Sequence, residues 1–353
     1  MKQHTSDIPT PRATPPSLDG GGQRAPSVAL TILRALRVSQ WTKNGLVILA
    51  ALFSRQLTEP ATLLRVAVAF FAFSFAASAI YIFNDLLDRQ SDRLHPTKRH
   101  RPIAAGLLTT RAAIILGGVS LGVSLALTGL LASGALYPPA DLQRDPFAAY
   151  GGAPLLFALS IVGYLGLNAA YTLRLKRLVL WDVFSIAFGF ALRAVAGAFA
   201  AGVYISPWFY LATIFLSLVL AIGKRRAELV RATAAASAQP EQLDQSGVRH
   251  ALRDYTLPLL DQLMGVVVTS ALITYSLYTF QADTPGGALL MLTVPCVIFG
   301  VFRYLYLVYV RAQGEAPDRL LFTDPQILGS VLLCLLIIAA ALYGPAAFHI
   351  ARP

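Results

Sequence analysis

Apolar residues occur along this chain in long blocks that are separated by short polar stretches. A helix that crosses a membrane needs about 20 mostly apolar residues. Nine blocks approach or exceed this length: Leu30–Phe53, Ala61–Phe83, Ala112–Leu136, Pro154–Thr172, Leu178–Val203, Trp208–Ile222, Leu257–Phe280, Ala288–Val310 and Ile327–Phe348. The pattern predicts an all-α integral membrane protein with about nine transmembrane helices.

The first of these blocks is the weakest, because charged side chains interrupt it. Arg34, Arg37 and Lys43 fall inside Leu30–Phe53. A charge at membrane depth is costly. We therefore expect this segment to begin as an interfacial helix and to enter the membrane only near Asn44.

The composition agrees with a membrane protein. Hydrophobic residues make up 56% of the 353 positions and charged residues 13%, whereas soluble domains carry about 25% charged residues. The formal charge of +11 would suggest nucleic acid as a partner of a soluble chain. Here the basic residues lie in loops between apolar blocks, which favours membrane orientation and phosphate ligands over nucleic acid. Cys296 and Cys334 lie in separate apolar blocks and indicate neither a disulfide framework nor a zinc site.

Loop charges predict the orientation. Met1–Pro26 is polar and rich in Pro, Gly and Ser, without the apolar core of a signal peptide. We expect residues 1–28 to form a disordered cytoplasmic tail and residues 29–353 to form one transmembrane domain. With the N-terminus inside, the loops after helices 2, 4, 6 and 8 carry most of the Lys and Arg. This asymmetry predicts a protein of the cytoplasmic (inner) membrane, with the polar loops Asp85–Arg111 and Lys224–Tyr255 facing the cytoplasm.

A dense group of charges follows the second predicted helix. Asn84, Asp85, Asp88 and Asp92 occupy positions i, i+1, i+4 and i+8. At ~100° per residue, these oxygen-bearing side chains fall on one side of a continuous helix. Mg²⁺ prefers a few carboxylates plus phosphate oxygens, and clustered carboxylates repel each other without a cation. The spacing predicts a site for Mg²⁺ and a diphosphate; it leaves open a solvated helix whose Asp residues pair with neighbouring Arg.

Basic residues come directly after the acidic group. Pro96 and Pro102 stop the helix, so that Lys98 and Arg101 can fold back and hold diphosphate oxygens. His95 lies beside a proline and is expected to order the loop rather than to bind a metal.

Other polar residues occur near or inside predicted helices. Lys43 and Asn44, at the start of the first helix, are placed to reach a phosphate. Lys176 is expected to attract a lipid phosphate or to anchor a helix end. Asp182 and Arg193 are eleven residues apart in one helix, or ~16 Å along its axis, so a direct salt bridge between them is not expected.

The segment Asn84–Gly106, NDLLDRQSDRLHPTKRHRPIAAG, resembles the first aspartate-rich motif of the UbiA superfamily of intramembrane prenyltransferases, NDxxDxxxD followed by RP and G. Four more segments are similar to the decaprenyl-phosphate phosphoribosyltransferase branch: Arg37–Asn44, Tyr171–Lys176, Gly189–Gly197 and Lys224–Leu229. The resemblance covers the chain from about Arg34 to its C-terminus. It implies a UbiA-type helical bundle with long cytoplasmic loops after helices 2 and 6.

The second of these loops departs from the pattern of the superfamily's prenyl-diphosphate users, which usually carry a second aspartate motif there. This chain instead has Lys224, Arg225, Arg226 and Glu228, with Arg253, Asp254 and Tyr255 near the end of the loop. An acidic cluster facing a basic one suits a metal-bound diphosphate and a further phosphate without its own metal. We therefore expect Lys224, Arg225, Glu228 and Tyr255 to bind the substrate or its phosphate; the alternative is a basic loop without a ligand.

The resemblance implies Mg²⁺-dependent transfer of 5-phosphoribosyl from phosphoribosyl diphosphate to a polyprenyl phosphate, for cell-envelope polysaccharide precursors. Asn84, Asp85, Asp88 and Asp92 would hold the metal, and the three aspartates would be the catalytic residues. The attacking lipid phosphate is already anionic, so no dedicated general base is needed. Two alternatives remain: prenyl transfer from a prenyl diphosphate to an aromatic or other acceptor, and transport of an anionic solute. A homo-oligomer is also left open.

Overall fold

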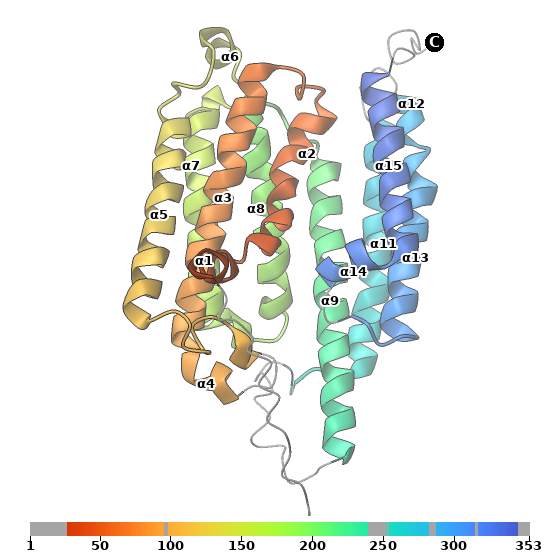
Figure 1. The fold of residues 1–353 in the computed structure, drawn as a ribbon. Coiled ribbons are helices and arrows are strands. Elements are labelled where there is room, and N and C mark those ends of the chain that lie inside the picture. Colours follow the sequence, from red (N-terminus) through yellow and green to blue (C-terminus); the bar gives the residue numbers. More distant parts are fainter. Residues whose placement is uncertain are drawn as a thin grey trace, which may run out of the picture.

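The computed structural model describes residues 27–94, 98–238, 252, 254–281, 287–314 and 317–344, and in these ranges it contains helices and no strands (Figure 1). The α-helices are α1 Val28–Leu36, α2 Leu46–Phe53, α3 Pro60–Leu87, α4 Arg89–Leu94, α5 Thr110–Ala132, α6 Pro139–Gln143, α7 Ala153–Leu173, α8 Trp181–Ala201, α9 Pro207–Ala238, α11 Leu257–Gln281, α12 Gly287–Leu290, α13 Thr293–Tyr309, α14 Pro317–Thr323 and α15 Pro325–Tyr343. Short 3₁₀ segments are η1 Val38–Gly45, η2 Lys98–His100, η3 Ala148–Tyr150 and η4 Leu175–Arg177.

Seven of the described helices are long and apolar enough to cross a membrane, namely α3, α5, α7, α8, α9, α11 and α15. The eighth predicted span is instead the short α12 followed by α13, which has 17 residues. Pro295 lies in the first turn of α13, where proline is tolerated because it displaces no helical hydrogen bond. The predicted all-helical membrane bundle is confirmed, whereas the count of nine full spans is not.

The first predicted span is broken into α1, η1 and α2. Arg37 ends α1 in a left-handed conformation, with φ 52°, and its N–H donates to the Arg34 carbonyl. The polar run VSQWTKNG then forms η1 before the apolar α2 begins at Leu46. This segment was the weakest of the predicted spans, and the interruption falls among its charged and polar residues. Of the predicted tail, residues 1–26 lie outside the described residues.

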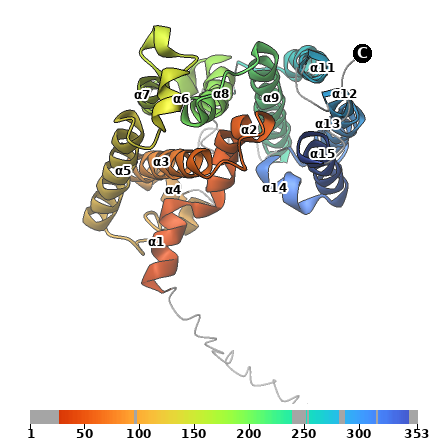
Figure 2. The ribbon, with the colours of Figure 1, turned by 90° about the horizontal axis from the view of Figure 1, so that it is seen from above.

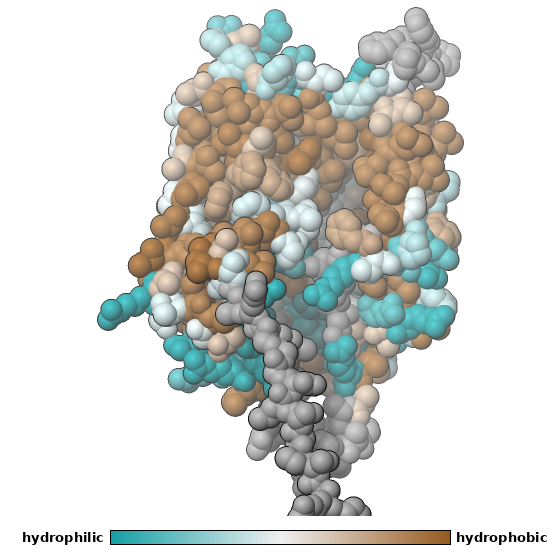
Figure 3. Space-filling view, in the orientation of Figure 1, coloured by the Kyte–Doolittle hydropathy of each residue, from teal (hydrophilic) through white to brown (hydrophobic). Residues whose placement is uncertain are grey.

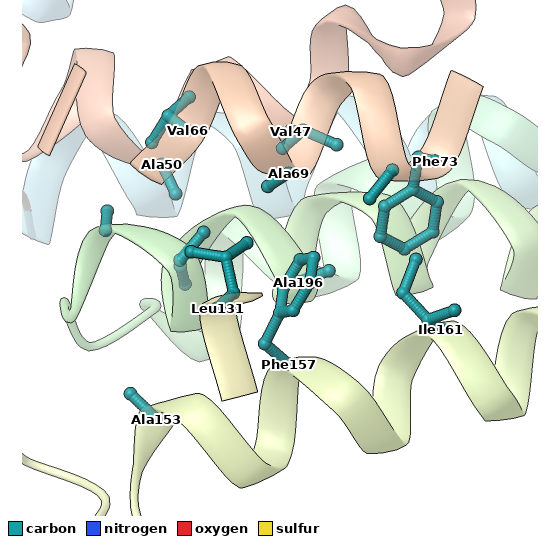
Figure 4. Close-up of a cluster of buried hydrophobic side chains, with 14 of the residues drawn as sticks. Val47, Ala50, Val66, Ala69, Phe73, Leu131, Ala153, Phe157, Ile161 and Ala196 are labelled. Atoms are coloured by element: carbon teal, nitrogen blue, oxygen red, sulfur yellow. The ribbon is translucent and has the colours of Figure 1, made fainter. Parts of the chain in front are cut away.

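Two apolar cores share the helix α8. The first joins α8 to α2, α3, α5 and α7, and Figure 4 shows Phe73, Leu131, Phe157 and Ile161 packed within it. The second joins α8 to α9, α11, α13 and α15. From above, α3, α5 and α7 lie on one side of the molecule and α11, α13 and α15 on the other (Figure 2).

Helices α2 and α8 approach each other unusually closely at Gly197. A Cβ atom on Gly197 would lie 2.1 Å from the Val47 carbonyl oxygen. Only a residue without a side chain therefore allows the two backbones to pack at this distance.

On the face seen in Figure 3, the surface is apolar over a broad band and polar toward the ends. Large apolar side chains such as Ile115, Val162, Phe302 and Leu336 are exposed on the surface of the bundle. Such a band suits contact with lipid rather than with water. At the lower end in Figure 1, α3 ends and α4 begins, α7 ends and α8 begins; we call this the α4 end.

Candidate active site

The α4 end contains the predicted acidic residues, but not on one continuous helix. α3 ends at Leu87, and Asp88 caps it with φ −88° and ψ 5° before α4 begins at Arg89. The Asp88 N–H donates to the Asn84 carbonyl and the Asp92 N–H to the Asp88 carbonyl. The chain therefore turns at Asp88 while Asp92 stays close to the end of α3.

Asp85 and Asp92 converge on one arginine. The Nη1 atom of Arg101 lies 3.0 Å from Asp85 Oδ1 and 2.6 Å from Asp92 Oδ2. The two carboxylate side chains are 4% and 3% exposed. Burial makes an unpaired carboxylate costly, so the shared guanidinium compensates for the charge of both. This confirms that Arg101 folds back onto the acidic residues.

A second arginine at this position, Arg37, was not among the predicted site residues. Its Nη2 atom lies 2.5 Å from Asp85 Oδ1, and its guanidinium lies 4.9 Å from the centroid of the Tyr81 ring. Arg37 comes from the break between α1 and η1, 48 positions before Asp85. Arg37 could have been predicted as a site residue from the sequence, because it is the first residue of the segment Arg37–Asn44 that resembles the family.

The other two acidic-motif residues contact different partners. Asp88 Oδ1 lies 3.8 Å from Lys176 Nζ, and its side chain is 44% exposed. The Asn84 side-chain oxygen accepts a hydrogen bond of 2.8 Å from the Thr172 hydroxyl. Across the described residues, no three His, Cys, Asp or Glu side chains form a group that could hold a metal ion.

The donor set nevertheless suits a hard divalent cation. Mg²⁺ usually takes one or two carboxylates and completes its shell with water and phosphate oxygens. Asp85 and Asp92 already direct one oxygen each at a single positive nitrogen. The residues present therefore fit a cation bound together with a phosphorylated substrate better than a cation enclosed by protein.

Asn44, predicted to reach a phosphate, is buried in a polar network instead. Its Oδ1 accepts a 2.7 Å hydrogen bond from Arg193 Nε, and its Nδ2 donates to the Ser74 hydroxyl at 3.0 Å. Arg193 also donates to the Tyr164 hydroxyl and to the Gly189 carbonyl. These contacts join η1 to α3, α7 and α8, and Arg193 and Asp182 form no pair, as predicted. Lys43, which precedes Asn44 in the chain, is half-buried.

Arg225, predicted to bind phosphate, forms buried ion pairs. Its Nε atom lies 2.9 Å from Asp182 Oδ2, and both side chains are 1% exposed. Its Nη1 atom contacts Glu228 one turn further along α9. Two carboxylates thus compensate for one guanidinium, and the Arg225–Asp182 pair links α9 to α8.

Tyr255 completes this connection. Its hydroxyl donates to Asp182 Oδ1 at 2.7 Å and accepts from the Leu180 N–H at 2.8 Å. Leu180 has φ 67°, a left-handed backbone that the bond to its N–H helps to hold. Burial raises the pKa of Tyr255, and its hydrogen bond to Asp182 raises it further, so the phenol stays protonated as a donor.

The predicted second loop does not begin at Lys224, because α9 continues to Ala238. Arg226 Nε donates to Asp261 Oδ1 at 2.6 Å, and its guanidinium packs 4.0 Å from the centroid of the Tyr309 ring. Lys224 is half-buried and Asp254 is exposed. At the first loop, Lys98 is half-buried and begins η2, which ends directly before Arg101. His95 and Arg253 lie outside the described residues.

Residues 45–229 match the UbiA prenyltransferase family. The chain is 32% identical over 317 residues to the decaprenyl-phosphate phosphoribosyltransferase of Corynebacterium glutamicum, with 88% of this chain and 86% of the relative covered. It is 31% identical over 295 residues to the Mycobacterium tuberculosis protein of the same name, with 81% and 86% covered.

Solved structures show the same fold. A UbiA homolog from Archaeoglobus fulgidus bound to GPP and Mg²⁺ superposes with a TM-score of 0.61 at 19% identity, covering 88% of this chain and 98% of the homolog. The family match spans more than half of the chain, and the curated relatives extend the similarity over most of the rest. The chain therefore belongs to the UbiA prenyltransferase family of integral-membrane enzymes.

Proposed function

We propose that this protein transfers the 5-phosphoribosyl group of phosphoribosyl diphosphate to a polyprenyl phosphate, in reach of the cytoplasm at the inner membrane. The structural observation that carries the proposal is the buried pair Asp85 and Asp92, which direct their oxygens at one cationic nitrogen. It is supported by two relatives that are named decaprenyl-phosphate phosphoribosyltransferases and align over most of their length.

In the proposed reaction, an oxygen of the lipid phosphate attacks the anomeric carbon of the ribose. The bond from that carbon to the diphosphate oxygen breaks, and diphosphate leaves with the electron pair. Bound Mg²⁺ would supply positive charge for the leaving diphosphate. Asp85, Asp88 and Asp92 would hold the metal, with Asn84 supporting them through the turn at the end of α3.

The basic residues of the α4 end would orient the phosphate groups. Arg101, Lys98 and Lys176 lie around the aspartates or beside them in the chain, and guanidinium groups bind phosphate oxygens in bidentate fashion. Lys43 is a further candidate, whereas the contacts of Asn44, Arg225, Glu228 and Tyr255 with other protein groups favour a supporting role for these four. Lys224 is the remaining candidate for a second phosphate.

The direct test is a turnover assay on the purified protein with Mg²⁺. It offers labelled phosphoribosyl diphosphate with polyprenyl phosphate in one arm, and a prenyl diphosphate with an aromatic acceptor in the other. We expect phosphoribosyl lipid in the first arm and no product in the second. Product in the second arm with none in the first would establish the alternative prenyl transfer and refute the proposal.

A further inference from the structure

The Arg101 guanidinium occupies the position between Asp85 and Asp92 where a cation would bind. We infer that Arg101 stands in for the divalent cation in the ligand-free enzyme and transfers to the diphosphate when cation and substrate enter together. This inference rests on the proposed function, because it assumes that these aspartates receive a cation. It adds that the free enzyme binds the cation weakly until diphosphate is present.

The geometry puts a single atom in the shared position. Arg101 Nη1 contacts Asp85 Oδ1 at 3.0 Å and Asp92 Oδ2 at 2.6 Å, so one nitrogen serves both buried carboxylates. A cation that lies between these two oxygens, in contact with both, has to take the place of that nitrogen. The two occupants of the site therefore exclude each other.

The charges at the site explain why diphosphate is needed for the exchange. Two carboxylates, Asp85 and Asp92, face two guanidiniums, Arg37 and Arg101, so these four groups balance. A divalent cation added to this group leaves two excess positive charges in a partly buried site, where repulsion is poorly screened. A diphosphate offsets this excess positive charge and gives the displaced guanidinium a bidentate partner.

The surroundings of Arg101 allow its guanidinium to leave the aspartates, whereas those of Arg37 hold its guanidinium against Asp85. The backbone of Arg101 is held on both sides, since its N–H donates to the Lys98 carbonyl and its carbonyl accepts from the Ala105 N–H. Its side chain is 30% exposed, so the guanidinium can turn outward without moving the loop. The Arg37 guanidinium also packs against the Tyr81 ring, and it keeps Asp85 oriented during the exchange.

The test measures metal affinity rather than turnover. Mn²⁺ binding to the purified protein is followed by its paramagnetic resonance signal, with and without inorganic diphosphate. The wild type should bind Mn²⁺ weakly alone and much more tightly with diphosphate. Arg101→Gln removes the competing charge, and we expect its diphosphate-free Mn²⁺ affinity to rise about tenfold. The benefit from diphosphate should shrink in the same variant.

Matched variants keep the test decisive. Arg99→Gln removes a charge from the exposed neighbour, whose Nε contacts His100, and should leave Mn²⁺ affinity unchanged. If Arg101→Gln does not fold, Arg101→Lys replaces it: lysine lacks the planar fork, and we expect a diphosphate-free rise of about threefold. An affinity that stays level or falls in the folded variant would overturn the role of Arg101. Absence of Mn²⁺ binding to the wild type in both conditions would instead refute the metal site in the proposed function.

Discussion

The Arg225 guanidinium and the Asp182 carboxylate form an ion pair inside the bundle, with 2.9 Å between Nε and Oδ2 and each side chain 1% exposed. Arg225 belongs to the sequence KRRAEL, which was predicted to bind phosphate at the start of a loop but lies within α9. Its partners show that this guanidinium joins helices α8 and α9. A buried charge of this kind is held by its counter-charge and is not available to a soluble substrate.

Breaking this pair should destabilise the protein strongly. Asp182→Asn leaves the Arg225 charge buried with one carboxylate fewer, and we expect a loss of about 3–5 kcal/mol in the free energy of unfolding. The measurement is denaturant unfolding of the detergent-solubilised protein. The control is Asp261→Asn, which breaks the more exposed pair with Arg226 and should cost about 0–1 kcal/mol. If Asp182→Asn unfolds like the wild type but has a raised KM for phosphoribosyl diphosphate, Arg225 would instead be a substrate-binding residue.

Loss of the hydroxyl should affect the free energy of unfolding differently at two buried tyrosines. Tyr255→Phe leaves Asp182 Oδ1 and the Leu180 N–H without their partner, and we expect it to cost about 1–3 kcal/mol. The Tyr304 hydroxyl is buried and has no hydrogen-bond partner among the described residues. Tyr304→Phe should therefore be neutral or stabilising in the same unfolding measurement. Equal losses in both variants would contradict the assigned role of Tyr255.

Asp88→Asn should reduce turnover without a large change in the free energy of unfolding. The Asp88 side chain is 44% exposed, so its replacement should change stability by no more than about 0.5 kcal/mol. If Asp88 holds the metal, turnover of phosphoribosyl diphosphate should fall by about 100-fold. Expression level, membrane insertion and thermal unfolding serve as controls, with Asp261→Asn as the matched carboxylate. Near-normal turnover would remove Asp88 from the metal site.

Helix packing at Gly197 gives a prediction that is independent of function. In Gly197→Ala, the new methyl group would lie 2.1 Å from the Val47 carbonyl oxygen, so α2 and α8 must move apart. We expect a loss of about 2 kcal/mol in the free energy of unfolding. Gly166→Ala on α7 is the control, since its added Cβ meets nothing within 4 Å, and it should stabilise the helix by up to about 1 kcal/mol. Comparable effects of the two substitutions would show that α2 and α8 do not pack as described.

The hydrophobic pattern was sufficient for much of the fold. The length of each apolar block determines whether a helix can cross a membrane, and the polar segments between blocks locate the helix ends. The charges of Arg34, Arg37 and Lys43 indicated the break in the first span. The short α13 was not, because its apolar block is continuous with that of α12 and only the turn at Met291–Leu292 divides them.

The acidic motif and the family were likewise determined by the sequence alone, since both depend on residue types at fixed spacing. Which charges pair was decided by the tertiary structure. Arg37 meets Asp85 across 48 positions, and Tyr255 meets Asp182 across 73. Residues so far apart come together only when helices pack, and the cost of burying a charge then selects among the oppositely charged partners within reach. For that reason the sequence indicated an acidic site beside basic residues, while the structure distinguished the cation at the site, Arg101, from the cation inside the bundle, Arg225.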